Sequence, residues 1–116
     1  MKKSERRKNI WRKTKGRCAH CGVVPPPKQQ TIDHFIPLSV GGTFDRRNLV
    51  PLCRKCNEAR QAQKINPRQY YKYAPQWVIN SCYAYYHDWK ASTRAMDGYI
   101  HGDYKKREFI YKKVGD

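Results

Sequence analysis

The sequence predicts a small α+β domain built around a four-cysteine zinc site, followed by an aromatic helical extension. Two Cys-x-x-Cys pairs, Cys18/Cys21 and Cys53/Cys56, enclose 31 residues whose pattern runs strand, loop, strand, with a helix starting at the second pair. Ile, Leu, Val and Phe make up only 19 of the 116 residues, which is little for a hydrophobic core. A short chain with so few aliphatic residues usually needs a disulfide or a metal ion to hold its fold.

The spacing of the cysteines favours a structural zinc ion over disulfide bonds. Four thiolates arranged in two such pairs suit the tetrahedral coordination of Zn²⁺. Disulfides or redox-active dithiols are the alternative, but the basic N-terminal segment lacks the apolar stretch of an export signal. His20 could replace a cysteine as ligand, although we expect it to lie at the tip of the first pair, exposed or near phosphate.

The charge of the chain points to a polyanionic partner. Lys and Arg number 25 against 9 Asp and Glu, a net charge of +16, and residues 1–17 alone carry half of it. Such a basic segment attracts nucleic acid through counterion release, whereas the alternative is a solvated tail. No run of 18 apolar residues exists, which argues against a membrane span.

The chain divides into a basic arm, a central domain and an aromatic, basic extension packed on that domain: 1–17, 18–65 and 66–116. The arm is expected to form a short helix over residues 4–15, with Ile10 and Trp11 turned toward the domain. Three consecutive prolines exclude regular structure from the loop at 23–30.

Within the central domain, β-branched and aromatic residues predict a strand at 31–36. A Gly-Gly turn signal lies in the loop that follows. A second short strand is predicted at 48–52, where Pro51 suggests an edge strand or its end. Good helix formers then predict a helix from Cys56 to Ile65.

In the extension, apolar and aromatic residues at three- and four-residue steps, Trp77 among them, predict a helix over residues 76–95. We expect these aromatic residues to pack on the central domain, and the alternative is a stacking platform for bases. Cys82 is expected to be a buried, inert thiol. The tail is expected to form a hairpin around Gly102-Asp103. Two of its basic residues are expected to contact phosphate, and the alternative is that they are only solvated: Lys105 and Lys106.

The stretch between and after the cysteine pairs also holds residues typical of hydrolytic sites. This part of the chain, about residues 11–65, resembles the HNH endonucleases, in the branch that carries a four-cysteine zinc site. The motifs that carry the resemblance are, in order, Asp33-His34, Pro37-Leu38-Ser39, Gly41-Gly42, Asn48-Leu49, Leu52-Cys53-Arg54-Lys55-Cys56 and Asn57.

The resemblance implies a ββα-metal fold, also called the His-Me finger, and hydrolysis of phosphodiester bonds, usually in DNA. His34 would act as general base, since imidazole accepts a proton near neutral pH. Asp33 and Asn57 would hold one divalent ion, and Asn48 would hold the loop and align His34. The third letter of the family name stands for a histidine, and Asn57 takes that position in this chain, which makes it an HNN variant. Because an amide oxygen is a harder ligand than imidazole, we expect Mg²⁺ or Mn²⁺ at this site.

One structural condition and several alternatives accompany this interpretation. Neighbours on a regular strand point to opposite faces, so Asp33 and His34 share a site only if the strand is irregular or ends there. Asp33 and His34 could instead be a mere strand pair, and Asn57 a simple helix cap. The main alternative for the whole chain is a catalytically inactive zinc-knuckle module that binds nucleic acid, and a protein-interaction domain would leave the charge unexplained.

Nucleic-acid contacts are expected from the arm and from the loop before the second strand: Arg6, Arg7, Lys8, Arg12, Lys13, Lys15, Arg46 and Arg47. The expected partner is DNA, cut as a nick or as a double-strand break. Because small nucleases of this kind suit a phage or mobile element, we expect a cytoplasmic protein in a bacterium or phage-infected cell. It would act as a monomer or with other phage proteins.

Overall fold

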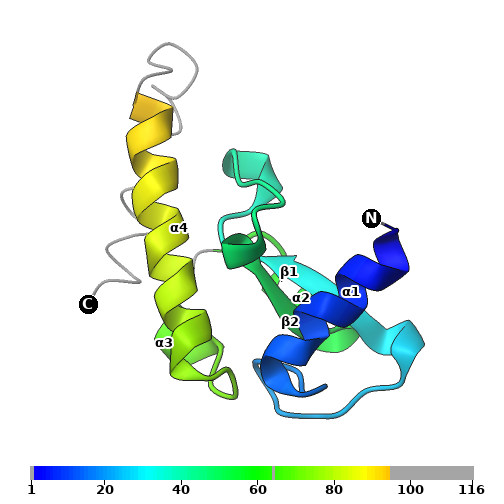
Figure 1. Ribbon diagram of the computed structural model, residues 1–116. Helices are drawn as coiled ribbons and strands as arrows, with labels where there is room; N and C mark the ends of the chain where they lie inside the picture. Colours follow the sequence, from blue (N-terminus) through cyan, green and yellow to red (C-terminus); the bar gives the residue numbers. More distant parts are fainter. Residues whose placement is uncertain (1, 64, 95–116) are drawn as a thin grey trace.

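The computed structural model describes residues 2–63 and 65–94, which form four α-helices around a two-stranded sheet (Figure 1). The strands are β1 (Gln30–His34) and β2 (Leu49–Cys53), and the helices are α1 (Lys3–Trp11), α2 (Arg54–Arg60), α3 (Pro67–Tyr70) and α4 (Gln76–Arg94). The hairpin predicted around Gly102-Asp103 lies outside the described residues, as do Lys105 and Lys106. Within the described residues, no helix is long and apolar enough to cross a membrane.

The two strands pair antiparallel, with Asp33 opposite Val50 and His34 opposite Leu49. β1 ends at His34, two residues before the predicted end. The reason is that the backbone of Ile36 bonds to the side chain of Asn48 instead of to a neighbouring strand. The early end of the strand meets the condition under which Asp33 and His34 can serve one site.

Pro51 lies in the middle of β2, opposite Ile32. Each strand of a two-stranded sheet has an open edge, so the missing N–H of a proline costs no ladder hydrogen bond there. The Pro51 carbonyl instead accepts a hydrogen bond of 2.9 Å from the Ala19 N–H. This bond docks the first cysteine pair onto the sheet.

Helix α1 is shorter than predicted but belongs to the fold rather than forming a loose arm. It ends at Trp11, and a short 3₁₀ turn follows at Arg12–Thr14. Ile10 and Trp11 are buried, as predicted, and the Trp11 indole donates a hydrogen bond of 2.9 Å to the Thr31 carbonyl of β1. Figure 1 shows α1, in blue, beside the sheet.

Helix α2 differs from the prediction at both ends. It begins at Arg54 because Cys53, in extended conformation, is its N-cap, and it stops at Arg60 instead of Ile65. Gln61 has a positive φ of 54°, which turns the chain away. The buried Arg60 guanidinium donates to the Gln63 carbonyl beyond this turn and so stabilises the early end.

Helix α4 follows the predicted pattern and supplies much of the core. Its buried side chains, most of them aromatic or sulfur-containing, enlarge a core that has few aliphatic residues: Val78, Ile79, Cys82, Tyr85, Tyr86 and Trp89. The Tyr85 hydroxyl accepts a hydrogen bond from the Thr43 N–H, and Trp89 donates one to the Gly41 carbonyl. Trp77, which the helical pattern predicts to pack on the central domain, is 53% exposed because the neighbouring Val78 takes the inward position.

Candidate active site and metal centre

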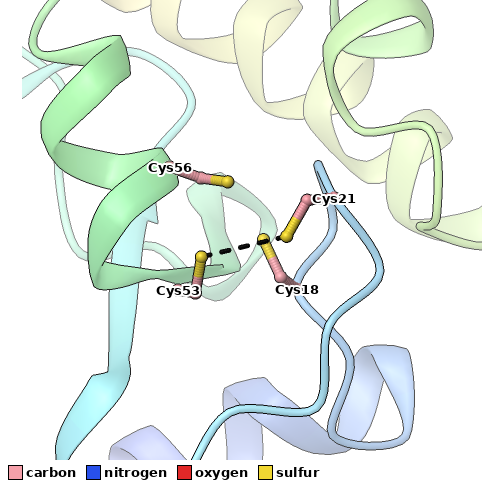
Figure 2. Close-up of side chains that lie close together, drawn as sticks. All are labelled: Cys18, Cys21, Cys53 and Cys56. Atoms are coloured by element: carbon pink, nitrogen blue, oxygen red, sulfur yellow. Dashed lines mark hydrogen bonds between the residues drawn. The ribbon is translucent and has the colours of Figure 1, made fainter.

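The four cysteines come together at one point of the fold. Their sulfur atoms all lie within 4.8 Å of one another, and the Sγ atoms of Cys21 and Cys53 are 3.9 Å apart (Figure 2). Four Zn–S bonds of about 2.3 Å in a tetrahedron place the sulfurs about 3.8 Å apart. The cluster therefore fits a zinc ion with little movement.

The two cysteine pairs reach this point from different elements. Cys53 ends β2 and Cys56 lies in the first turn of α2, whereas Cys18 and Cys21 lie in the loop that follows the 3₁₀ turn Arg12–Thr14. Burial raises the pKa of Cys53 and Cys56, so a bound cation is what would hold them as thiolates at neutral pH. Burial acts the same way on Cys18, but neighbouring backbone N–H groups outweigh it and lower its pKa.

His20 and Cys82 do not belong to this cluster. The His20 ring stacks on Tyr70 with ring centroids 4.0 Å apart, and its Nδ1 lies 2.7 Å from the Tyr70 carbonyl oxygen. Instead of standing free at the tip, His20 anchors the first cysteine pair to α3. Cys82 is fully buried, and burial raises its pKa to about 12, as expected of an inert thiol.

Asp33, His34 and Asn57 line one cleft, with a volume of about 260 Å³, on the side of the domain where β1 meets α2. The loop after β1 forms its other wall, through Pro37, Leu38 and Ser39. The structure thus brings together three residues that lie up to 24 positions apart in the sequence.

Asp33 is 4% exposed and is held from one side only. Its Oδ2 accepts hydrogen bonds from the Arg60 guanidinium and, at 2.7 Å, from the Tyr71 hydroxyl. Burial raises the pKa of Asp33, while Arg60 and Tyr71 oppose that effect and favour the carboxylate. Among the described residues Oδ1 has no partner, so it is the oxygen available to a metal ion.

Arg60 is the main residue of the site that the sequence interpretation missed, because it counted there only as a good helix former. It is 2% exposed and donates to the carbonyl oxygens of His34 at 3.0 Å and Phe35 at 2.8 Å. Burial alone would lower its pKa, but Tyr71 and Asp33 beside it raise the pKa. Its spacing of three residues from Asn57, which places both on one helix face, was the available signal.

Asn57 is oriented by its amide nitrogen. Nδ2 donates to Thr31 Oγ1 at 2.9 Å and to the Ile32 carbonyl at 3.3 Å. Because a carbonyl only accepts, the amide nitrogen must face β1, and Oδ1 is left for a ligand. Asn57 is the fourth residue of α2, whose N-cap is Cys53, so the alternative of a simple helix cap is wrong.

One ring nitrogen of His34 is enclosed by the protein. Nε2 is buried and has no hydrogen-bond partner in the described part of the chain. The imidazole meets the Phe44 ring perpendicularly, with centroids 4.7 Å apart. Burial lowers the pKa of His34, with Asp33 opposing and Arg60 and Arg6 reinforcing the effect, so the ring is neutral at pH 7.

Asn48 acts on the loop rather than on a ligand. It is fully buried, its Oδ1 accepts from the Ile36 N–H at 2.7 Å, and its Nδ2 donates to the carbonyls of Ile36 and Thr43. A Cβ on Gly42 would lie 1.7 Å from the Ile36 oxygen, so only glycine fits where the loop closes on itself. Both residues fix the chain that follows His34, which is the position expected for a scaffold residue.

The predicted nucleic-acid contacts fall into two groups. Lys8, Arg12, Lys15 and Arg46 are exposed, and Arg6 and Arg7 are half-buried. Lys13, in contrast, is buried, and its Nζ donates to the carbonyls of Arg46 and Leu49, so it braces the fold and is not free to contact nucleic acid. Arg47 is paired with Asp45 and Asp88, at 2.8 and 2.6 Å.

The comparison with protein families agrees with this geometry. Residues 18–63 match the family model described as HNH endonuclease, a segment that contains both cysteine pairs and Asp33, His34, Asn48 and Asn57. This part of the chain is therefore an HNH domain of the type with a four-cysteine metal site, with the small ββα-metal fold. The family is one of metal-dependent nucleases, which act on nucleic acid. A search of curated proteins found no match for the chain.

Proposed function

We propose that the protein is a metal-dependent endonuclease that hydrolyses phosphodiester bonds in DNA. The observation that carries this proposal is the common cleft of Asp33, His34 and Asn57. Among the described residues, the Oδ1 atoms of Asp33 and Asn57 accept no hydrogen bond. Hydrolysis of a phosphodiester needs a metal ligand set and a base side by side.

In this proposal Oδ1 of Asp33 and Oδ1 of Asn57 hold one Mg²⁺ or Mn²⁺, because both are hard oxygen donors. The ion, when bound, neutralises charge on the phosphate and stabilises the leaving oxygen. His34 accepts the proton of the attacking water through Nδ1, since Nε2 is covered by the protein.

Arg60 has a positioning role in the same proposal. Its charge keeps Asp33 ionised, and its bonds to the carbonyls of His34 and Phe35 hold the backbone that carries the base. A displacement of about 1 Å in a catalytic group can cost about 100-fold in rate, so this support matters for activity.

Nucleic acid is the proposed substrate class because exposed cations lie on α1 and in the loop before β2, and DNA is the substrate that the family resemblance implies. Lys8, Arg12 and Lys15 lie on α1 and the turn after it, and Arg46 lies in the loop before β2. Their combined charge would bind the phosphate backbone without reading its sequence.

Incubation of supercoiled plasmid with the protein tests the proposal directly. With Mg²⁺ or Mn²⁺ we expect conversion to nicked or linear DNA, and with EDTA none. His34→Ala should lose cleavage while its affinity for the plasmid changes by less than about twofold. Cleavage by His34→Ala at the rate of the wild-type protein would contradict the role of this residue.

A second candidate, a nucleic-acid-binding module without catalysis, is favoured by one observation. The buried guanidinium of Arg60 already neutralises Asp33, which weakens the attraction of this carboxylate for a metal ion. The same plasmid assay separates the two functions, since a binding module would retard the plasmid and leave it supercoiled at every divalent ion concentration.

A further inference from the structure

Phe44 lies between an arginine of α1 and the histidine of the cleft. The Arg6 Cζ atom is 5.0 Å from the centroid of the Phe44 ring, and the His34 ring contacts the same ring at 4.7 Å. Phe44 nevertheless remains 53% exposed. Its burial therefore contributes little to the core, while its ring contacts both Arg6 and His34.

The guanidinium of Arg6 is held in place without being neutralised. In the part of the chain that the structure describes, the Arg6 side chain forms no ion pair or hydrogen bond, whereas Arg47 and Arg60 are both paired with aspartates. A guanidinium that rests on an aromatic face keeps its N–H donors free for an anion. Such a fork binds phosphate oxygens in pairs.

We propose that Arg6 binds a phosphate of the substrate beside the one that is cut, and that Phe44 positions Arg6 and His34 relative to each other. This inference rests on the proposed function, because it takes the cleft to be the active site. It adds α1, which lies outside the matched segment 18–63, to the residues that act on substrate.

The two residues have different tasks. Arg6 contacts the substrate, so its loss removes an interaction with the phosphate during cleavage. Phe44 acts through its neighbours, so its loss frees both the guanidinium and the imidazole to leave their positions. Because both substitutions disturb the same set of contacts, their effects on the cleavage rate should not multiply when they are combined.

Lys3→Ala is the matched control for Arg6→Ala. Both substitutions remove one positive charge from α1, and Lys3 is exposed and is not among the residues proposed to bind the substrate. At saturating protein and with Mg²⁺, we expect Arg6→Ala to slow single-turnover cleavage of a short duplex at least about tenfold. Lys3→Ala should change this rate by less than about twofold.

Two substitutions separate the ring of Phe44 from its bulk. Phe44→Leu keeps an apolar side chain without an aromatic face and should slow single-turnover cleavage about tenfold, whereas Phe44→Tyr should retain the rate of the wild-type protein. Both variants should keep the midpoint of thermal unfolding of the wild-type protein, since Phe44 is half exposed. The double variant that combines Arg6→Ala with Phe44→Leu should cleave no more slowly than the slower of the two single variants.

The outcomes are distinct. If Arg6→Ala matches Lys3→Ala, or if the effects of Arg6→Ala and Phe44→Leu multiply, the inference is overturned while the proposed function stands. If the wild-type protein binds the duplex with Mg²⁺ and never cuts it, the proposed function fails and the inference fails with it.

Discussion

Asp33 of β1 and Arg60 of α2 form a buried ion pair at the centre of the candidate active site. Their side chains are 5% and 1% exposed, and the guanidinium also donates to the backbone carbonyls of His34 and Phe35. The pair joins the strand that carries the candidate base to the helix that carries Asn57. Its removal should therefore affect stability and activity together.

Arg60→Met keeps most of the aliphatic volume and leaves Asp33 buried without a counter-charge. We expect a loss of about 3–5 kcal/mol in the free energy of unfolding, measured by urea denaturation of the zinc-loaded protein. Lys55→Met, which removes an exposed cation of the same helix, should change stability by less than about 0.5 kcal/mol. Equal stabilities of the two variants would contradict the proposed contribution of the Asp33–Arg60 pair to the free energy of unfolding.

Cys53→Ser should release the structural metal. We expect elemental analysis to find about one zinc per wild-type chain and none in the variant, whose folding should be lost with the metal. Cys82→Ala, which removes a cysteine outside the cluster, should keep one zinc. Since thiolates must form for zinc to bind, the affinity should fall as the pH falls. Free thiols and no zinc in the purified wild-type protein would refute the metal site.

Asn57 should decide which divalent ion supports cleavage. Asn57→Ala removes the amide oxygen and should slow Mg²⁺-dependent cleavage about 100-fold, with duplex binding unchanged. Asn57→His replaces that oxygen by an imidazole nitrogen and should shift the preference from Mg²⁺ toward Mn²⁺, Co²⁺ or Ni²⁺. Cleavage rates across a series of ions measure this shift, and an unchanged ion preference in Asn57→His would place the metal elsewhere.

Lys13 should behave as a structural residue whose effect depends on pH. Burial lowers its pKa from 10.5 to about 8, so between these values the unfolded chain binds more protons than the folded one. The free energy of unfolding of the wild-type protein, relative to Lys13→Met, should therefore rise as the pH rises from 8 to 10.5.

Lys15→Ala provides the comparison for Lys13→Met, since Lys15 is exposed and only two residues away. If Lys15 contacts one phosphate, its loss should reduce the slope of log affinity against log salt by about 0.9, while Lys13→Met leaves the slope unchanged. The reverse result would show that Lys13 contacts the nucleic acid after all.

The sequence alone was sufficient for the local parts of this site. The spacing of Cys18, Cys21, Cys53 and Cys56 predicts a zinc cluster because each pair fits one turn of chain. Asp33, His34 and Asn57 are candidate site residues through the resemblance to the HNH endonucleases. The helix at Gln76–Arg94 was predictable because its apolar residues repeat at helical spacing.

Only the tertiary structure decided which charges are free. Arg60 and Lys13 look like exposed cations in the sequence, yet partners 27 and 36 residues away bury them, and no local pattern contains such partners. The contact between Arg6 and Phe44 also depends on the tertiary structure, because it forms only when α1 packs on the sheet. Spacing specifies contacts within a turn or a strand, whereas contacts between elements depend on how their surfaces pack, and packing is a property of the whole fold.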